Sequence, residues 1–196
     1  QQEAIPETQF TGYEAARFEG NTAWRLFCVE GTGYRAPARA EVGESVILVS
    51  ETTPFYAESG GQMGDRGVIR AGEASLHVET VVRFGGVVMH LGTVGVGPLE
   101  ISDADGSMLC MEVDSVSRQK VMANHTCTHL LNQALRKHVD AEIDQKGSSV
   151  TDERLRFDLG YDAAMTEAEM MEVETEVNAW IGRDIEVCTG YAGLEA

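Results

Sequence analysis

The chain has 196 residues, of which 43% are hydrophobic and 24% are charged, as is typical of a globular protein with a sizeable core. Its formal net charge of −17 argues against a general nucleic-acid binder. No apolar run approaches the length needed to cross a bilayer, so we expect no membrane partner. The four cysteines form no C-x-x-C motif, which predicts a reducing, cytoplasmic location.

Charge is distributed unevenly along the chain. The segment 118–156 holds seven basic and five acidic residues, a net charge of +2, which leaves −19 for the remainder. Because phosphate groups repel acidic surfaces, this segment is the part of the chain that could tolerate a nucleic-acid backbone.

Short β-type segments separated by turn residues fill the first half of the chain. The β-branched run at 45–50 predicts a buried strand, and Gly85-Gly86 predicts a hairpin turn between 81–84 and 87–90. Many short strands with closely spaced turns predict a small β-barrel, which we assign to a domain at residues 1–113. Further strands are expected at 23–29, 68–70, 75–84 and 108–113.

The pattern changes at Asp114, where an amphipathic helix is predicted to begin and to run to Val139. Asp114 or Ser115 can cap its start, and basic residues occupy its last turn, where the helix dipole favours them. A core-facing stripe is predicted at Ala123, Cys127, Leu130, Leu131, Ala134 and Leu135.

After this helix, strands are predicted at 141–150 and 154–159, then a helix whose start Thr166 and Glu169 cap, and a last strand at 185–191. These elements predict a two-layer α+β domain at residues 114–196. The predicted fold class is therefore α+β, with an N-terminal small β-barrel followed by the two-layer unit.

His125 and His129 lie four residues apart on the predicted helix, so their side chains share one face. Two imidazoles one helical turn apart are spaced as a single metal ion requires, although a pair of polar residues on a solvated face gives the same pattern. His77, His90 and His138 are isolated in sequence, and we expect a surface or packing role for each.

Two further sequence patterns could indicate a catalytic nucleophile, but both are weak. Ser59 lies in Glu58-Ser59-Gly60-Gly61-Gln62, but the glycine-rich stretch that follows does not favour the helix that a nucleophile elbow requires. A tight turn, or a loop whose backbone approaches a substrate closely, explains these glycines better. Cys127 stands between the two histidines in sequence, but helix geometry directs it to the opposite side, which favours a core cysteine over a Cys–His dyad.

Four stretches resemble the alanyl-tRNA synthetase family and keep its motif order. They are TTPFYAESGGQMGDRG at 52–67, NHTCTHLLNQALR at 124–136, QKGSSVTDERLRFD at 145–158 and VNAWI at 177–181. The resemblance covers nearly all of the chain and implies the β-barrel and the editing domain of such a synthetase. Freestanding alanyl-tRNA editing proteins share this pair of domains and remain a close alternative.

The resemblance implies hydrolysis of mischarged tRNA-Ala, chiefly Ser-tRNA-Ala and Gly-tRNA-Ala. A second hydrolytic site is needed because small amino acids differ too little in binding energy for one pocket to separate them. The implied partner is the acceptor end of tRNA-Ala, and no obligate protein partner is evident. ATP and Mg²⁺ are implied only for an aminoacylation domain that the chain does not contain.

The family also implies roles for individual residues. His125 and His129 correspond to two of four Zn²⁺ ligands, and the family's later C-x-x-x-H motif would supply the other two. Because that motif does not occur here, we expect a C-terminally truncated domain whose remaining ligands lie beyond Ala196, with weak zinc binding and slow deacylation.

Gln145 corresponds to an editing-site glutamine, and Thr126 to a position beside the editing pocket; both are candidate catalytic residues. The stretch Ser59, Gly60, Gly61 and Gln62 corresponds to a glycine-rich loop that contributes to substrate binding. A non-catalytic interaction module that retains the editing fold is the alternative from another functional class, and the intact His125, His129 and Gln145 argue against it.

Overall fold

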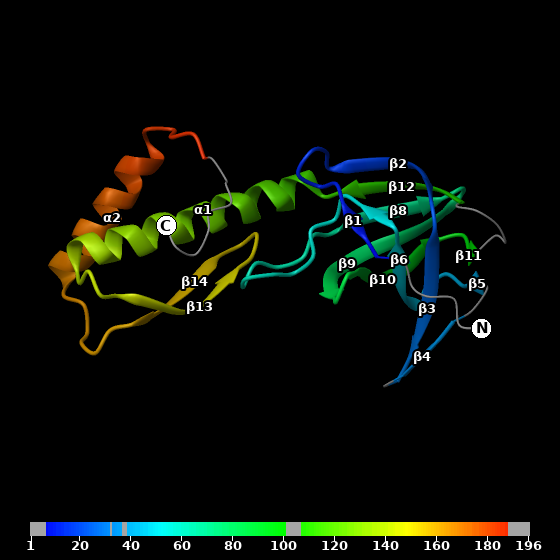
Figure 1. Cartoon of the computed structure of the whole chain (residues 1–196), viewed down its shortest axis with the longest axis horizontal. Helices are drawn as coiled ribbons and strands as arrows, with labels where there is room; N and C mark the ends of the chain where they lie inside the picture. The colour runs from blue at the N-terminus through cyan, green and yellow to red at the C-terminus, as the bar shows by residue number, and fades with distance from the viewer. Residues whose placement is uncertain (1–6, 32, 37–38, 101–106, 188–196) are drawn as a thin grey trace.

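The computed structural model describes residues 7–31, 33–36, 39–100 and 107–187. Most of the strands gather at one end of an elongated molecule (Figure 1). Helix α1 (Ser115–His138) runs from this end to the other, where it meets helix α2 (Glu167–Ile181) and the hairpin of β13 (Asp144–Val150) and β14 (Leu155–Gly160). None of the described helices is long and apolar enough to span a membrane.

Within the described residues, eight strands form one antiparallel sheet in the order β2-β12-β8-β9-β10-β6-β3-β4. These strands are β2 (Arg17–Thr22), β3 (Trp24–Glu30), β4 (Gly33–Arg35), β6 (Ser45–Ser50), β8 (Gly67–Ala71), β9 (Ala74–Phe84), β10 (Val87–Val96) and β12 (Ser107–Val113). Two short pairs accompany the sheet: β1 (Gln9–Phe10) with β7 (Thr52–Thr53), and β5 (Arg39–Ala40) with β11 (Leu99–Glu100).

The predicted fold class is wrong in its first half, because the sheet is not a closed barrel. A barrel would require the end strands β2 and β4 to pair, but in the described part of the chain β2 pairs with β12 and β4 with β3. Strand number and turn spacing are alike for a barrel and an open sheet, so these sequence signals could not distinguish the two. The positions of the individual strands were predicted well.

The sheet core lies along these strands. The run at 45–50 is β6, in which Val46, Leu48 and Val49 are buried, as a continuous apolar strand requires. Strands β9 and β10 form the predicted hairpin, and Gly85 adopts a positive φ of 58° in its turn. We call the buried cluster of these strands the sheet core; its buried members are Trp24, Leu26, Cys28, Ala40, Val46, Leu48, Phe55, Ala57, Ile69, Ala74, Leu76, Val78, Val81, Val88, Val94, Leu99, Leu109, Met111 and Val113.

Helix α1 confirms the predicted element within a residue at either end. The Asp114 carboxylate caps it by accepting hydrogen bonds from the N–H groups of Val116 and Ser117, both at 3.0 Å. Its buried face differs in part from the predicted stripe: Ala123 is exposed, whereas Thr128 is buried. The helix rests on different partners along its length, so a single apolar periodicity does not describe it.

The second half of the fold prediction is also wrong. The described part of the chain is mostly β, with 45% of its residues in strands and 23% in helices, and a two-layer α+β domain is not a good description of residues after 114. The β13–β14 hairpin is there, and α2 starts with the predicted capping box of Thr166 and Glu169. However, residues 185–187 form no strand, and the rest of the predicted last strand lies outside the described residues.

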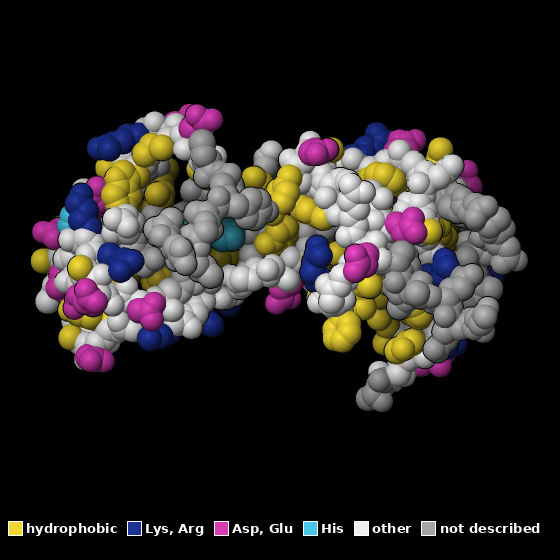
Figure 2. Space-filling model, in the orientation of Figure 1, with side chains coloured by type: hydrophobic (Ala, Val, Ile, Leu, Met, Phe, Trp, Pro, Cys, Tyr) yellow, Lys and Arg dark blue, Asp and Glu magenta, His cyan; other side chains and the backbone are white. Residues whose placement is uncertain are grey.

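A separate and smaller core joins α1, α2 and the hairpin. We call it the helical core; its buried members are Ala134, Leu135, Ile143 and Val173. In Figure 2 a waist separates the two ends of the molecule, and hydrophobic side chains gather there. The two cores fall on either side of the predicted boundary at 113/114, although the division into domains stays a prediction.

Candidate functional site

Helix α1 places His125 and His129 together in space. Their rings are stacked, with centroids 5.2 Å apart and planes inclined by 16°. His125 is half-buried and His129 is exposed, so the pair lies at the surface and is not enclosed by packing. Thr126 is half-buried beside them and borders the same cleft.

The glycine-rich loop reaches the hairpin across the waist of the molecule. Backbone hydrogen bonds between Ser59 and Gln62 close a tight turn, with N–O distances of 3.1 and 2.9 Å. The carbonyl of Gly61 then accepts from Val150 N–H at 2.8 Å, and the carbonyl of Val150 accepts from Met63 N–H at 3.0 Å. The loop therefore docks on β13 in the manner of an added strand.

This docking brings Gln62 to His125. Nδ1 of His125 lies 2.5 Å from Oε1 of Gln62, and because a carbonyl oxygen can only accept, Nδ1–H is the donor. The lone pair of the neutral ring is then on Nε2. Burial lowers the pKa of His125 from its usual value, and the neighbouring His129 lowers it further; both effects favour the neutral ring.

The histidine pair borders a cleft of about 420 Å³, which we call the histidine cleft. Its lining combines aromatic, apolar and polar side chains from α1, from the loop and from the segment around β1. The lining residues are Phe10, Gly12, Tyr13, Tyr56, Gln62, Asp65, Arg118, Met122, His125, Thr126, His129 and Val187.

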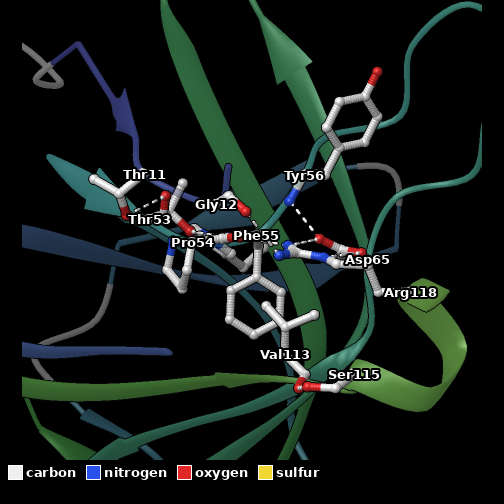
Figure 3. A network of polar contacts seen from close by, with 11 residues as sticks. Thr11, Gly12, Thr53, Pro54, Phe55, Tyr56, Asp65, Val113, Ser115 and Arg118 are labelled. Carbon is white, nitrogen blue, oxygen red and sulfur yellow. Dashed lines mark hydrogen bonds and ion pairs between the residues drawn. The ribbon is translucent and has the colours of Figure 1, made fainter. Parts of the chain in front are cut away.

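An ion pair between Asp65 and Arg118 forms one part of this lining (Figure 3). Both side chains are largely buried, at 7% and 14% exposed. Arg118 also donates to the carbonyls of Gly12 at 3.0 Å and Pro54 at 2.5 Å, while Asp65 accepts from Tyr56 N–H at 2.6 Å. The network ties α1 to the loop and to the segment before β2.

The remaining predicted residues lie beside the cleft or away from it. Gln145 is exposed on β13 and donates to Ser148 Oγ at 3.2 Å, and Ser148 Oγ lies 3.4 Å from the carbonyl of Gly60. Neither Gln145 nor Ser59 is among the cleft-lining residues. The structure thus gathers Gln62, Thr126 and the histidines at the cleft, and Gln145 is not among them.

Sequence reasoning missed Asp65, Arg118 and the aromatic side chains of the cleft. In the sequence, Arg118 is one of seven basic residues in the segment 118–156, and its partner lies 53 positions earlier in the chain. Two oppositely charged residues so far apart in the sequence form no periodic pattern that would predict their contact. Cys127 is half-buried and lines an apolar cavity together with Leu131 and Phe157, and burial raises its pKa, but it is not a member of either buried core.

Among the residues that the structure describes, no three His, Cys, Asp or Glu side chains gather closely enough to hold a metal ion. His125 and His129 could supply two imidazole ligands. The lone pair of an imidazole nitrogen lies in the plane of its ring, so the lone pairs of two nearly parallel rings do not converge on one metal ion. To bind the same ion as His125, the exposed His129 would have to rotate. The donor chemistry fits zinc in part, and the roles of these residues stay predictions.

A family model described as class II (A) tRNA synthetases matches residues 1–116, more than half of the chain. The chain belongs to this family. It is related to alanyl-tRNA synthetase, and the family is of the ligase type, with tRNA as its partner. The match includes the loop at 59–62 and ends at the first turn of α1, so His125, His129 and Gln145 lie beyond it.

Proposed function

We propose that the histidine cleft hydrolyses the ester of mischarged tRNA-Ala, with Ser-tRNA-Ala and Gly-tRNA-Ala as substrates. One observation carries the proposal: an imidazole that Gln62 orients, His125, lies against a second imidazole at an accessible cleft. A family that acts on tRNA supports RNA as the source of the substrate.

In this proposal His125 and His129 hold a zinc ion, together with ligands outside the described residues. When bound, the ion supplies a Lewis acid that polarises the ester carbonyl or lowers the pKa of a water. Gln62 is the positioning residue: by accepting from Nδ1–H it fixes the His125 tautomer and keeps Nε2 available. Thr126 contributes a hydroxyl at the cleft.

The reaction itself is an addition of water to the ester carbonyl that joins the amino acid to the terminal ribose. It releases the free amino acid and the ribose hydroxyl, and it takes no nucleotide cofactor. The loop and the Asp65–Arg118 network contribute by holding α1 and Gln62 in fixed relation, which keeps the reacting groups oriented.

The test is deacylation of Ser-tRNA-Ala under single-turnover conditions, with protein in excess, before and after addition of zinc. His125→Ala and His129→Ala should each slow the reaction by roughly 100-fold or more, since each removes one metal ligand. His77→Ala, which removes an exposed imidazole from β9, is the matched control and should leave the rate unchanged. Equal rates in all four proteins would refute the proposal.

A further inference from the structure

Three aromatic rings cluster on the lining of the histidine cleft. The Phe10 ring packs edge-to-face against Tyr13, with centroids 5.0 Å apart and planes at 83°, and against Tyr56 at 6.0 Å and 73°. Phe10 comes from β1, which pairs in parallel with β7, and Tyr56 follows β7 closely in the chain. The pairing of two strands therefore assembles the cluster at one place.

The cluster is not part of either buried core. Tyr13 is 83% exposed, while Phe10 and Tyr56 are half-buried. An aromatic ring left so exposed contributes little to folding, because its apolar surface stays in water. Figure 3 shows that the Tyr56 ring projects away from the Asp65–Arg118 pair, while its backbone N–H is fixed by Asp65.

The electrostatics of this part of the cleft do not suit a phosphate group. Arg118 is the cation of the lining, and its charge is already neutralised by Asp65. This part of the cleft presents uncharged aromatic rings, and such rings bind unpaired nucleobases by stacking. The aromatic cluster and the histidine pair border one continuous cleft, so a base and the ester on its own ribose could occupy it together.

We propose that Tyr13, supported by Phe10 and Tyr56, forms a stacking subsite for the terminal nucleobase of the RNA whose ester is hydrolysed. The inference rests on the proposed function for its choice of RNA. In this arrangement the aromatic cluster binds the base and thereby positions the acylated ribose. The hydrolysis itself takes place at the histidines.

The test measures binding without hydrolysis. The probes are a single-stranded RNA tetranucleotide that ends in adenosine and the same oligonucleotide with an abasic 3′-terminal ribose, titrated at low salt. We expect the complete oligonucleotide to bind roughly tenfold more tightly, and Tyr13→Ala to abolish that difference while Tyr13→Phe keeps it. Tyr34→Ala is the matched control, because Tyr34 is 72% exposed and also packs edge-to-face on a phenylalanine, Phe27.

Equal affinity of the unsubstituted protein for the two oligonucleotides would overturn the subsite. So would a Tyr13→Ala protein that retains the difference, or one that weakens both probes equally, as a general RNA- or protein-docking surface would. Since no ester is cleaved in this experiment, its result is independent of the deacylation assay. A base-dependent affinity combined with absent hydrolysis would uphold the subsite and refute the proposed reaction.

Discussion

His90 is fully buried in the sheet, and each of its ring nitrogens has a partner. Nδ1–H donates to the Leu48 carbonyl at 2.9 Å, so Nε2 accepts from the Thr53 hydroxyl at 2.7 Å. Burial lowers the pKa of His90 to about 4, against a smaller opposing effect of the Leu48 hydrogen bond. This histidine is a packing residue, as its isolation in the sequence predicts.

Protonation of His90 should therefore oppose folding. The unfolded chain takes up the proton near its ordinary pKa of 6.5 and the folded protein near 4, so stability is fully present above 6.5 and declines as the pH falls toward 4. At pH 4.5 the contribution of this residue to the free energy of unfolding should be lower than at pH 7 by roughly 2 to 3 kcal/mol.

Urea unfolding at the two pH values measures this effect. His90→Gln cannot titrate, so its own loss of stability between pH 7 and pH 4.5 should be smaller than that of the unsubstituted protein. His77→Gln, at an exposed position, should keep the full pH dependence. An unchanged pH dependence in His90→Gln would show that other groups cause it.

At the scale of elements, Gly61 decides whether the loop can dock on β13. Its φ is +82°, and a Cβ there would lie 2.4 Å from the Ser148 carbonyl oxygen. Gly60 has a similar positive φ of +59°, but a Cβ there would meet nothing within 4 Å. Alanine at Gly60 therefore tests backbone strain alone, whereas alanine at Gly61 adds a close contact to that strain.

We expect Gly61→Ala to displace the loop and to break the hydrogen bond between Gln62 and His125. Its readout is the imidazole nitrogen NMR spectrum of His125, which should lose the preference for the Nδ1–H tautomer. Gly60→Ala should cost about 1 kcal/mol of stability and keep the tautomer. Retention of the tautomer in both variants would mean that docking does not orient His125.

Local elements were predictable from the sequence because their signals are local. The apolar run of β6, the Gly85-Gly86 turn and the cap of α1 by Asp114 each depend on residues close in the chain. Sheet closure was not predictable, since it depends on whether β2 and β4 meet. In the cleft, the histidine spacing was readable, whereas the approach of Gln62 to His125 depends on pairing between distant segments.

At the scale of the whole molecule, α1 joins two cores of unequal size. The sheet core holds many large buried side chains, whereas the helical core has four buried members in the described chain. Polar contacts between them include Asn124 Nδ2 to the Thr151 carbonyl at 2.8 Å and the Asp65–Arg118 pair. A core as small as the helical one depends on such contacts with its neighbour.

Arg118→Ala should therefore uncouple the two cores. It leaves the buried Asp65 without its partner, a change that costs roughly 3 to 5 kcal/mol while α1 stays docked. Undocking returns the carboxylate to water, so the helical core should unfold at lower denaturant than the sheet core. In the unsubstituted protein we expect one common transition.

The chain provides a probe for each core, because its two tryptophans are Trp24 in the sheet core and Trp180 against the helical core. Tryptophan fluorescence in the Trp180→Phe and Trp24→Phe backgrounds follows them separately, each with and without Arg118→Ala. Arg70→Ala is the control: it breaks the exposed pair with Glu112 and should shift either transition by less than about 1 kcal/mol. If Arg118→Ala shifts both probes equally, the cores unfold as one unit, and the Asp65–Arg118 pair is not what couples them.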